Sequence, residues 1–145
     1  MDGLKQINDT FGHSEGSIAI AKTAAILRLT FRDSDIIARI GGDEFAVLAP
    51  AVTGAEIDNI IERLRVNLQV CNEESTAGYE LSLSIGWVII DHRNGASIEV
   101  LIAQADRAMY ANKRSKRAGR DSTTSIVDGF TPEISSQCKL VGRAR

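Results

Sequence analysis

The chain has 145 residues, 43% of them hydrophobic and 25% charged, which is the size and composition of one packed domain and excludes general disorder. The formal net charge of −2 argues against a nucleic-acid-binding protein, because such proteins carry a strong basic excess. Two cysteines give no sign of a disulfide framework and fit a reducing cytoplasm, and no apolar run approaches the roughly 20 residues that span a bilayer, so we expect a cytoplasmic chain without a membrane segment.

The first predicted element is a helix that begins near Ser17. Apolar residues recur at the spacing of one helix face, at Ile20, Ala24, Leu27 and Phe31. Ser17 is the predicted N-cap, because its hydroxyl can accept a hydrogen bond from a backbone N–H of the first turn.

Two short segments rich in strand-forming residues follow, at 36–40 and 45–49. The four residues between them are Gly-Gly-Asp-Glu. Since glycine is favoured where a tight turn needs a positive φ, we predict a β-hairpin with a glycine turn.

Helical and strand patterns then alternate along the chain. A helix is predicted around 57–68, a strand of strict alternation over 81–87, and a helix over 101–109 that continues into a basic run at 113–120. Residues 125–127 could add a short strand. Residues 129–145 show no amphipathic period, so we predict a domain at 1–128 and a C-terminal tail at 129–145.

This order of elements predicts the fold class. Helices, a hairpin and further strands in mixed order favour an α/β (α+β) sandwich, in which helices pack on a largely antiparallel sheet.

The predicted hairpin turn carries two adjacent carboxylates, Asp43 and Glu44. Successive side chains of an extended backbone point to opposite faces, so the two carboxylates are expected to have different roles. Carboxylates that face a nucleotide bind Mg²⁺, which prefers oxygen ligands and bridges phosphates. The alternative is a charged turn that is only solvated, and such turns are common.

Three further segments accompany this turn in a fixed order. They are the run Asp2-Gly3-Leu4-Lys5-Gln6-Ile7-Asn8-Asp9-Thr10-Phe11-Gly12-His13, the motif Arg32-Asp33-Ser34-Asp35, and the run Ala105-Asp106-Arg107-Ala108-Met109-Tyr110 followed by Lys113. With Gly-Gly-Asp-Glu-Phe, they resemble the GGDEF domain family of diguanylate cyclases over about residues 1–121. The resemblance implies a nucleotide-cyclase-like (ferredoxin-like) sandwich and an enzyme that condenses two GTP into cyclic di-GMP, with release of two pyrophosphates.

The resemblance also implies roles for the turn. Asp43 would be a ligand of Mg²⁺ or Mn²⁺, and Glu44 would lie beside the metal and the reacting 3′-hydroxyl as a metal or proton partner. Gly41 and Gly42 would let the nucleotide lie against the hairpin.

Other positions would bind the substrate. Asn8 would hydrogen-bond the purine edge, and Lys113 with Arg117 would hold the triphosphate. The latter two are four residues apart on a predicted helix, so they share a face and can bind one anion. The alternative for this basic run is a solvated helix end, where positive charge is favourable.

Turnover would require a homodimer, because each domain would hold one nucleotide and the two must face each other. A sensor domain upstream would regulate such an enzyme. Arg32 and Asp35 match the family's inhibitory site for the product cyclic di-GMP, and an arginine can bind a guanine edge or a phosphate with its forked guanidinium. The alternative for Arg32 and Asp35 is a solvated charge pair.

Two positions depart from the family pattern. The family has a first strand that ends in Asp-x-Asp before the opening motif; Asp2 matches the second of these carboxylates, and the first is absent. We therefore expect the sheet to lack a strand near its centre, which would expose apolar surface and unpaired backbone groups. Ser17 stands where the family usually has an aspartate that binds guanine, and a hydroxyl that can donate or accept selects guanine less sharply.

These departures keep two alternatives open. One is a promiscuous cyclase that also uses ATP and makes cyclic GMP-AMP, as in the subgroup that carries serine at the position of Ser17. The other is a degenerate module that binds cyclic di-GMP as a receptor without turnover. A pure dimerisation domain is a weaker alternative, since Glu44, Lys113 and Arg117 are retained.

Overall fold

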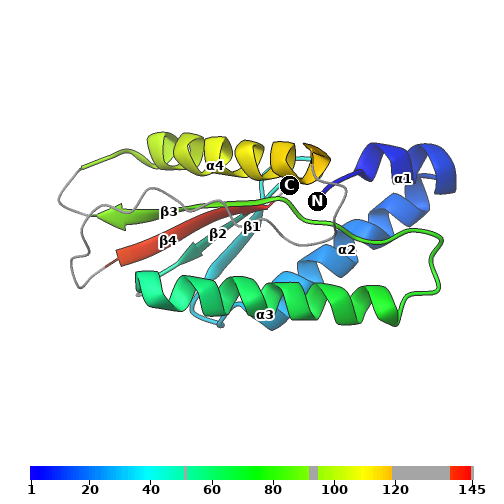
Figure 1. Cartoon of the computed structure of the whole chain (residues 1–145), viewed down its shortest axis with the longest axis horizontal. Coiled ribbons are helices and arrows are strands. Elements are labelled where there is room, and N and C mark those ends of the chain that lie inside the picture. The colour runs from blue at the N-terminus through cyan, green and yellow to red at the C-terminus, as the bar shows by residue number, and fades with distance from the viewer. Residues whose placement is uncertain (51, 92–94, 119–137, 145) are drawn as a thin grey trace.

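The computed structural model describes residues 1–50, 52–91, 95–118 and 138–144 of the chain. Along the chain its elements are α1 (Leu4–Phe11), α2 (His13–Thr30), β1 (Ile36–Arg39), β2 (Phe45–Ala49), α3 (Gly54–Glu73), β3 (Ile85–Asp91), α4 (Ile98–Ala118) and β4 (Cys138–Ala144) (Figure 1). None of the described helices is both long and apolar enough to cross a membrane.

The four described strands form one antiparallel sheet in the order β1-β2-β4-β3. Helix α4 packs on β3 and β4, and α2 packs on both α1 and α3. Figure 1 shows α4 along one side of the sheet and α3 along the other. The predicted sandwich of helices on a largely antiparallel sheet is therefore confirmed.

Strand β4 lies in the middle of this sheet, where the sequence predicted a gap. Leu140 pairs with Ala49 of β2 and with Ile89 of β3, and Ala144 pairs with Phe45 and Ile85. The expected exposure of an unpaired sheet centre is therefore wrong, because β4 pairs with both neighbouring strands.

The sequence also predicted no strand in this region. The segment Cys-Lys-Leu-Val-Gly-Arg-Ala contains a single strong strand former, the valine, so its own propensity is weak and its partners on β2 and β3 decide its conformation. The strand considered at 125–127, and the proposed boundary between residues 128 and 129, lie outside the described residues. The division into a domain and a tail stays a prediction.

Helices α3 and α4 bury the faces that the sequence predicted, whereas in α2 Leu27 is the one fully buried residue of the predicted face. Helix α3 buries Ile57, Ile60, Ile61 and Leu64, and Leu68 is partly buried. Its N-terminus is closed by a reciprocal contact: the backbone N–H and hydroxyl of Thr53 both donate to the Glu56 carboxylate, at 2.8 and 2.9 Å, and the N–H of Glu56 donates to the Thr53 carbonyl at 3.0 Å.

Helix α2 begins one turn earlier than predicted. Its N-cap is Gly12, whose φ of 88° lets the chain turn from α1 directly into α2. Ser17 is therefore a residue inside the helix, and its hydroxyl donates to the carbonyl of His13 at 3.0 Å. Helix α1 itself was not predicted, because it is only 8 residues long and its apolar residues Leu4, Ile7 and Phe11 make a short periodic pattern.

Strand β3 begins at Ile85 and not at Leu81. The side chain of Asn72 binds both backbone groups of Leu81, at 2.8 and 2.9 Å, and the N–H of Asp2 donates to the carbonyl of Ser82 at 2.7 Å. These partners satisfy both backbone groups of Leu81 and the carbonyl of Ser82 without a neighbouring strand. The segment 81–84 still buries Leu81 and Leu83, as its alternation predicted.

Candidate functional site

The acidic hairpin turn is closed by its own backbone and by one arginine. The N–H groups of Ile40 and Gly41 both donate to the carbonyl of Glu44, at 2.9 and 3.3 Å. The guanidinium of Arg39 donates to the carbonyls of Gly41 and Gly42, at 3.2 and 2.8 Å. Arg39 was missed by sequence reasoning, because an exposed arginine at a strand end gives no signal of its own.

The two glycines of the turn act differently from the prediction. Neither Gly41 nor Gly42 has a positive φ. A Cβ at Gly41 would lie 2.8 Å from Oε2 of Glu44, so this glycine leaves room for the Glu44 side chain, whereas a Cβ at Gly42 would meet nothing within 4 Å. The hairpin is confirmed, with Arg39 opposite Phe45, but close approach and not backbone strain explains Gly41.

The N-terminal segment lies against this turn. The backbone nitrogen of Met1 donates to the carbonyl of Asp43 at 2.5 Å, and the Met1 side chain is completely buried. Asp43 and Glu44 are half-buried. The next residue, Asp2, therefore follows directly on a residue that contacts the acidic turn.

Asp2 meets the basic helix at this corner. Its Oδ1 lies 3.5 Å from Nζ of Lys113, and its Oδ2 accepts hydrogen bonds from Ser82 and Ser84 at 3.1 and 2.9 Å. Lys113 is thus linked to the acidic turn through Asp2 and its neighbour Met1, whose nitrogen binds Asp43. Arg117 lies one turn further along α4, and the structure describes only its backbone.

The predicted base-binding residues come from the two N-terminal helices. Asn8 is half-buried on α1, and Ser17 is exposed near the start of α2. A Cβ at Gly16 would overlap with Oδ1 of Asn8, so Gly16 lets the amide of Asn8 lie directly against α2. The structure therefore places Asn8 beside the residue that precedes Ser17.

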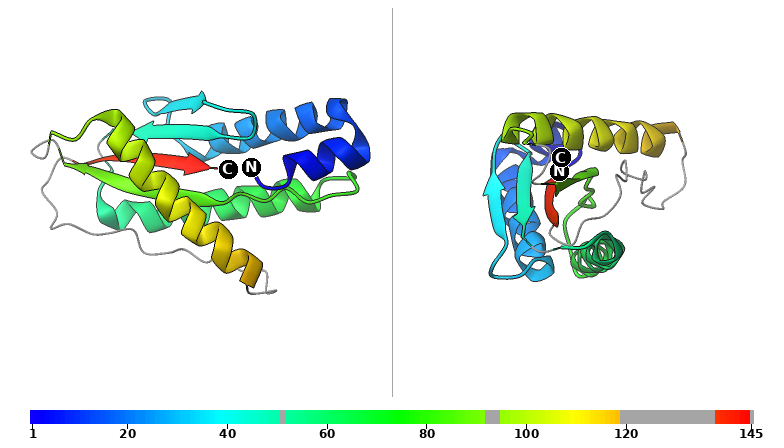
Figure 2. Two further views of the ribbon diagram at one scale, coloured as in Figure 1. Left: turned by 90° about the horizontal axis from the view of Figure 1, so that it is seen from above. Right: turned by 90° about the vertical axis from the view of Figure 1, so that its left-hand side faces the viewer.

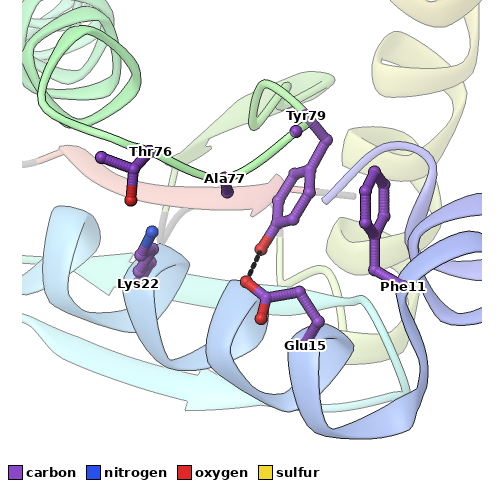
Figure 3. Close-up of a pocket in the computed structure, with 7 residues that line it drawn as sticks. Phe11, Glu15, Lys22, Thr76, Ala77 and Tyr79 are labelled. Atoms are coloured by element: carbon purple, nitrogen blue, oxygen red, sulfur yellow. Dashed lines mark hydrogen bonds between the residues drawn. The ribbon is translucent and has the colours of Figure 1, made fainter.

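A pocket of about 350 Å³ lies between α2 and the loop that precedes β3 (Figure 3). It is lined by Phe11, Glu15, Lys22, Thr76, Ala77, Gly78 and Tyr79, and none of these is a predicted site residue. The Tyr79 hydroxyl donates to Glu15 at 2.9 Å, as Figure 3 shows, and the rings of Phe11 and Tyr79 lie 5.3 Å apart. Burial, together with the neighbouring Glu15 carboxylate, raises the pKa of Tyr79 to about 12.

Arg32 and Asp35 form a turn between α2 and β1. Asp35 accepts a hydrogen bond from the N–H of Arg32 at 2.8 Å, and its own N–H donates to the Arg32 carbonyl at 2.9 Å. The guanidinium of Arg32 reaches Glu56 at 3.4 Å and stays 63% exposed. Hydrogen bonds from the backbone and side chain of Thr53, with a smaller effect of Arg32, lower the pKa of Glu56.

The acidic turn offers few side-chain ligands to a metal ion. Within the described residues no group of three histidine, cysteine or carboxylate side chains could hold one. Mg²⁺, however, is often bound by one or two carboxylates together with substrate phosphates. Asp43 and Glu44 fit that smaller donor set.

Comparison with known proteins gives a family match over most of the chain. The family model described as "Diguanylate cyclase, GGDEF domain" matches residues 1–119.

Similar curated proteins carry the same activity in their names. The chain is 38% identical over 121 residues to the diguanylate cyclase DgcP of Pseudomonas aeruginosa, covering 83% of this chain and 17% of that protein. It is 37% identical to the diguanylate cyclase TpbB of the same species, covering 82% of this chain and 28% of the relative. It is 34% identical to the probable diguanylate cyclase DgcC of Escherichia coli, covering 85% and 32%. The chain thus spans less than a third of the length of these relatives.

A solved structure shows the same fold. The GGDEF domain of DgcB from Caulobacter crescentus, determined in complex with c-di-GMP, matches with a TM-score of 0.61 and 24% sequence identity. The match covers 79% of this chain and 68% of that chain.

Proposed function

The chain belongs to the GGDEF domain family of diguanylate cyclases, and we propose that it condenses two GTP molecules into cyclic di-GMP, with release of two pyrophosphates. The observation that carries the proposal is a chain of contacts: the Met1 nitrogen binds Asp43 of the acidic hairpin turn, and the next residue, Asp2, pairs with Lys113. Carboxylates and a lysine that converge from distant parts of the chain are the groups that phosphoryl transfer requires.

We assign the substrate to the residues that surround these contacts. Lys113 and Arg117, one turn apart on α4, bind the triphosphate, and Asn8 binds the purine edge. Gly41 and Gly42 let the nucleotide lie against the hairpin. The 3′-oxygen of one nucleotide attacks the α-phosphorus of the other, so the active unit is a homodimer with one nucleotide on each chain.

Asp43 and Glu44 would hold the divalent metal, Mg²⁺ or Mn²⁺. A metal bound there supplies neutralisation of phosphate charge. We also assign to Glu44 the role of taking the proton of the attacking hydroxyl, and Gly41 leaves the space that its carboxylate occupies.

Arg32 and Asp35 form the proposed inhibitory site for cyclic di-GMP. Two observations support this site. The Arg32 side chain is exposed, and the Asp35 carboxylate stabilises the turn by accepting a hydrogen bond from the backbone N–H of Arg32. Ligand binding would replace the weak contact with Glu56, because a single ion pair at 3.4 Å on the surface contributes little.

Ser17 would relax the choice of base. Its hydroxyl carries no charge and can donate or accept, unlike the aspartate usual in the family, and its exposed position leaves it able to exchange its bond to the His13 carbonyl for one to a base. The proposal therefore includes the use of ATP beside GTP and the formation of cyclic GMP-AMP. We place this activity in the cytoplasm, under the control of a sensor domain upstream.

A second candidate is a receptor for cyclic di-GMP without turnover. The observation that favours it is the small donor set at the turn, since the described residues include no group of three metal-binding side chains. In that case Arg32 and Asp35 would still bind the dinucleotide.

A mass-resolved product assay with Mg²⁺ separates the two candidates. We expect cyclic di-GMP from GTP alone, cyclic GMP-AMP in addition when ATP is present, and neither product from Glu44→Gln. No product from the folded wild-type chain contradicts the cyclase. Calorimetric binding of cyclic di-GMP to that chain, lost in Arg32→Ala, would then establish the receptor.

A further inference from the structure

Asp2 is held by three hydrogen bonds to one short segment before β3. Its Oδ2 accepts from the hydroxyls of Ser82 and Ser84, at 3.1 and 2.9 Å. Its backbone N–H donates to the carbonyl of Ser82 at 2.7 Å. Two donors on one carboxylate oxygen fix the plane of the carboxylate, which directs the other oxygen toward Lys113.

This cluster is shielded from water. Ser84 has no exposed surface, and the side chains of Asp2 and Lys113 are only 18% and 24% exposed. Hydrogen bonds to a charged acceptor are stronger than those between neutral groups, and partial burial reduces screening. The orientation of the Asp2 carboxylate therefore depends strongly on the two serine hydroxyls.

Lys113 arrives from α4 in a fixed position. Helix α4 crosses β3 so closely that a Cβ at Gly86 would overlap with the backbone of Ala105 and Met109. Gly86 is two residues after Ser84, and Met109 is one helical turn before Lys113. The crossing therefore fixes the distance between the serines and the lysine.

We propose that Ser82 and Ser84 are positioning residues that act through Asp2 to hold the ammonium of Lys113 beside the acidic turn. The inference rests on the proposed function, in which Lys113 binds the triphosphate. The ammonium has three donors, so one can stay with Asp2 while the others reach phosphate oxygens. Without the serines Asp2 turns away, and Lys113 must be ordered by the nucleotide itself.

The first test measures the reactivity of Lys113 and does not require turnover. The full chain, with and without Ser82→Ala and Ser84→Ala together, is treated briefly with an amine-acylating reagent, and the modified lysines are quantified by mass spectrometry. We expect Lys113 to react about fivefold faster in the double variant, the effect of losing one net hydrogen bond. Lys5, exposed on α1, is the internal control and should not change.

Controls separate positioning from unfolding. Ser82→Thr keeps the hydroxyl at a half-buried position and should keep the slow reaction of Lys113. If the double variant does not fold, Ser82→Ala alone is used, because it empties no fully buried site. Unchanged Lys113 reactivity in a folded variant without the hydroxyl overturns the inference.

The second test adds GTP and Mg²⁺ to the labelling reaction. Protection of Lys113 in the wild-type chain, weaker in the double variant, supports the inference and the proposed function together. Faster labelling in the variant without protection by GTP in the wild type keeps the positioning role and contradicts the nucleotide role of Lys113. In the cyclase assay we expect KM for GTP to rise about fivefold while kcat changes less than about twofold, whereas partial unfolding would lower kcat alone.

Discussion

At the scale of single residues, Arg39 is the side chain that shapes the acidic turn. Its guanidinium spans the carbonyls of Gly41 and Gly42, so the tip keeps one conformation before any ligand arrives. A planar fork can bind two carbonyls at once, whereas an ammonium is a point charge. The residue thus contributes to preorganisation of Asp43 and Glu44 without carrying chemistry itself.

We expect Arg39→Ala to lower kcat/KM about tenfold, because a mobile turn holds the carboxylates of Asp43 and Glu44 less often in the position that the reaction needs. Its effect on Tm should be small, since the side chain is exposed. Arg39→Lys should behave like Arg39→Ala in the cyclase assay, because lysine lacks the fork. A variant with lysine and full activity would show that charge alone suffices.

Tyr79 gives the molecule a pH dependence that can be measured without activity. Folding raises the pKa of its hydroxyl from 10.0 to about 12, so the folded chain favours the neutral form. The stabilisation is complete below pH 10 and is lost as the pH rises from 10 toward about 12, because the unfolded chain loses this proton first.

The wild-type Tm should therefore fall more steeply between about pH 9.5 and about pH 11.5 than the Tm of Tyr79→Phe, which has no proton to lose there. Thermal melts over this range measure the difference. Tyr110→Phe is the matched control, because Tyr110 is 60% exposed on α4, and it should follow the wild type. Parallel curves for wild type and Tyr79→Phe would contradict the assigned shift.

Sequence reasoning selects residues of unusual chemistry and misses residues that act through long-range contacts. Asp43 and Glu44 stay predicted site residues, because adjacent carboxylates at a glycine turn suit metal and phosphate chemistry. The contacts of Asp2 with Ser82 and Ser84 join positions 80 and 82 residues apart, and no local pattern encodes them. Such residues become visible only when the chain is folded.

At the scale of elements, the crossing of α4 over β3 has the tightest backbone contact. Gly86 lies under the helix, where the carbonyl of Ala105 and the nitrogen of Met109 occupy the space of a side chain. Backbone atoms cannot move aside as the end of a flexible side chain can. The helix that carries Lys113 is therefore positioned by a glycine in the neighbouring strand.

We expect Gly86→Ala to reduce the free energy of unfolding by more than about 2 kcal/mol, because the new methyl group forces α4 away from β3. Urea denaturation measures this loss. Gly42→Ala is the matched control: a Cβ there would meet nothing within 4 Å, and its stability should stay within about 0.5 kcal/mol of the wild type. Equal stability of the two variants would mean that α4 crosses β3 elsewhere.

The interiors of elements could be predicted better than their ends. The 3.6-residue period identified α2, α3 and α4, because their buried faces are wide and regular. The start of α2 was missed, since it depends on the φ of Gly12, and the start of β3 was missed, since Asn72 takes the backbone of Leu81. Both ends depend on a backbone angle or a side-chain contact, and neither leaves a periodic pattern in the sequence.

At the scale of the whole molecule, the centre of the sheet is completed by the last described strand. β4 runs between β2 and β3 and ends beside the N-terminal segment, as both views in Figure 2 show. Ala144 lies opposite Phe45, and the nitrogen of Met1 binds Asp43, two residues before Phe45. Sequence patterns could not predict this closure, because a central strand with weak propensity is specified by its long-range partners.

This geometry predicts that the strand can be moved to the other end of the chain. In an antiparallel ladder the position opposite Asp43, where Met1 lies, comes two residues after Ala144, so a single residue between them bridges the two segments. We expect a permuted protein, with residues 138–145 joined in front of Met1 and removed from the end, to fold with a Tm within a few degrees of the wild type. Plain deletion of these residues should cost most of the roughly 5–15 kcal/mol of a small domain, since β2 and β3 would lose their shared partner. Urea denaturation of the wild-type, permuted and shortened proteins tests both expectations. An unchanged midpoint after deletion would mean that β4 does not hold the sheet together. Failure of the permuted protein alone to fold would mean that β4 does not run toward Met1.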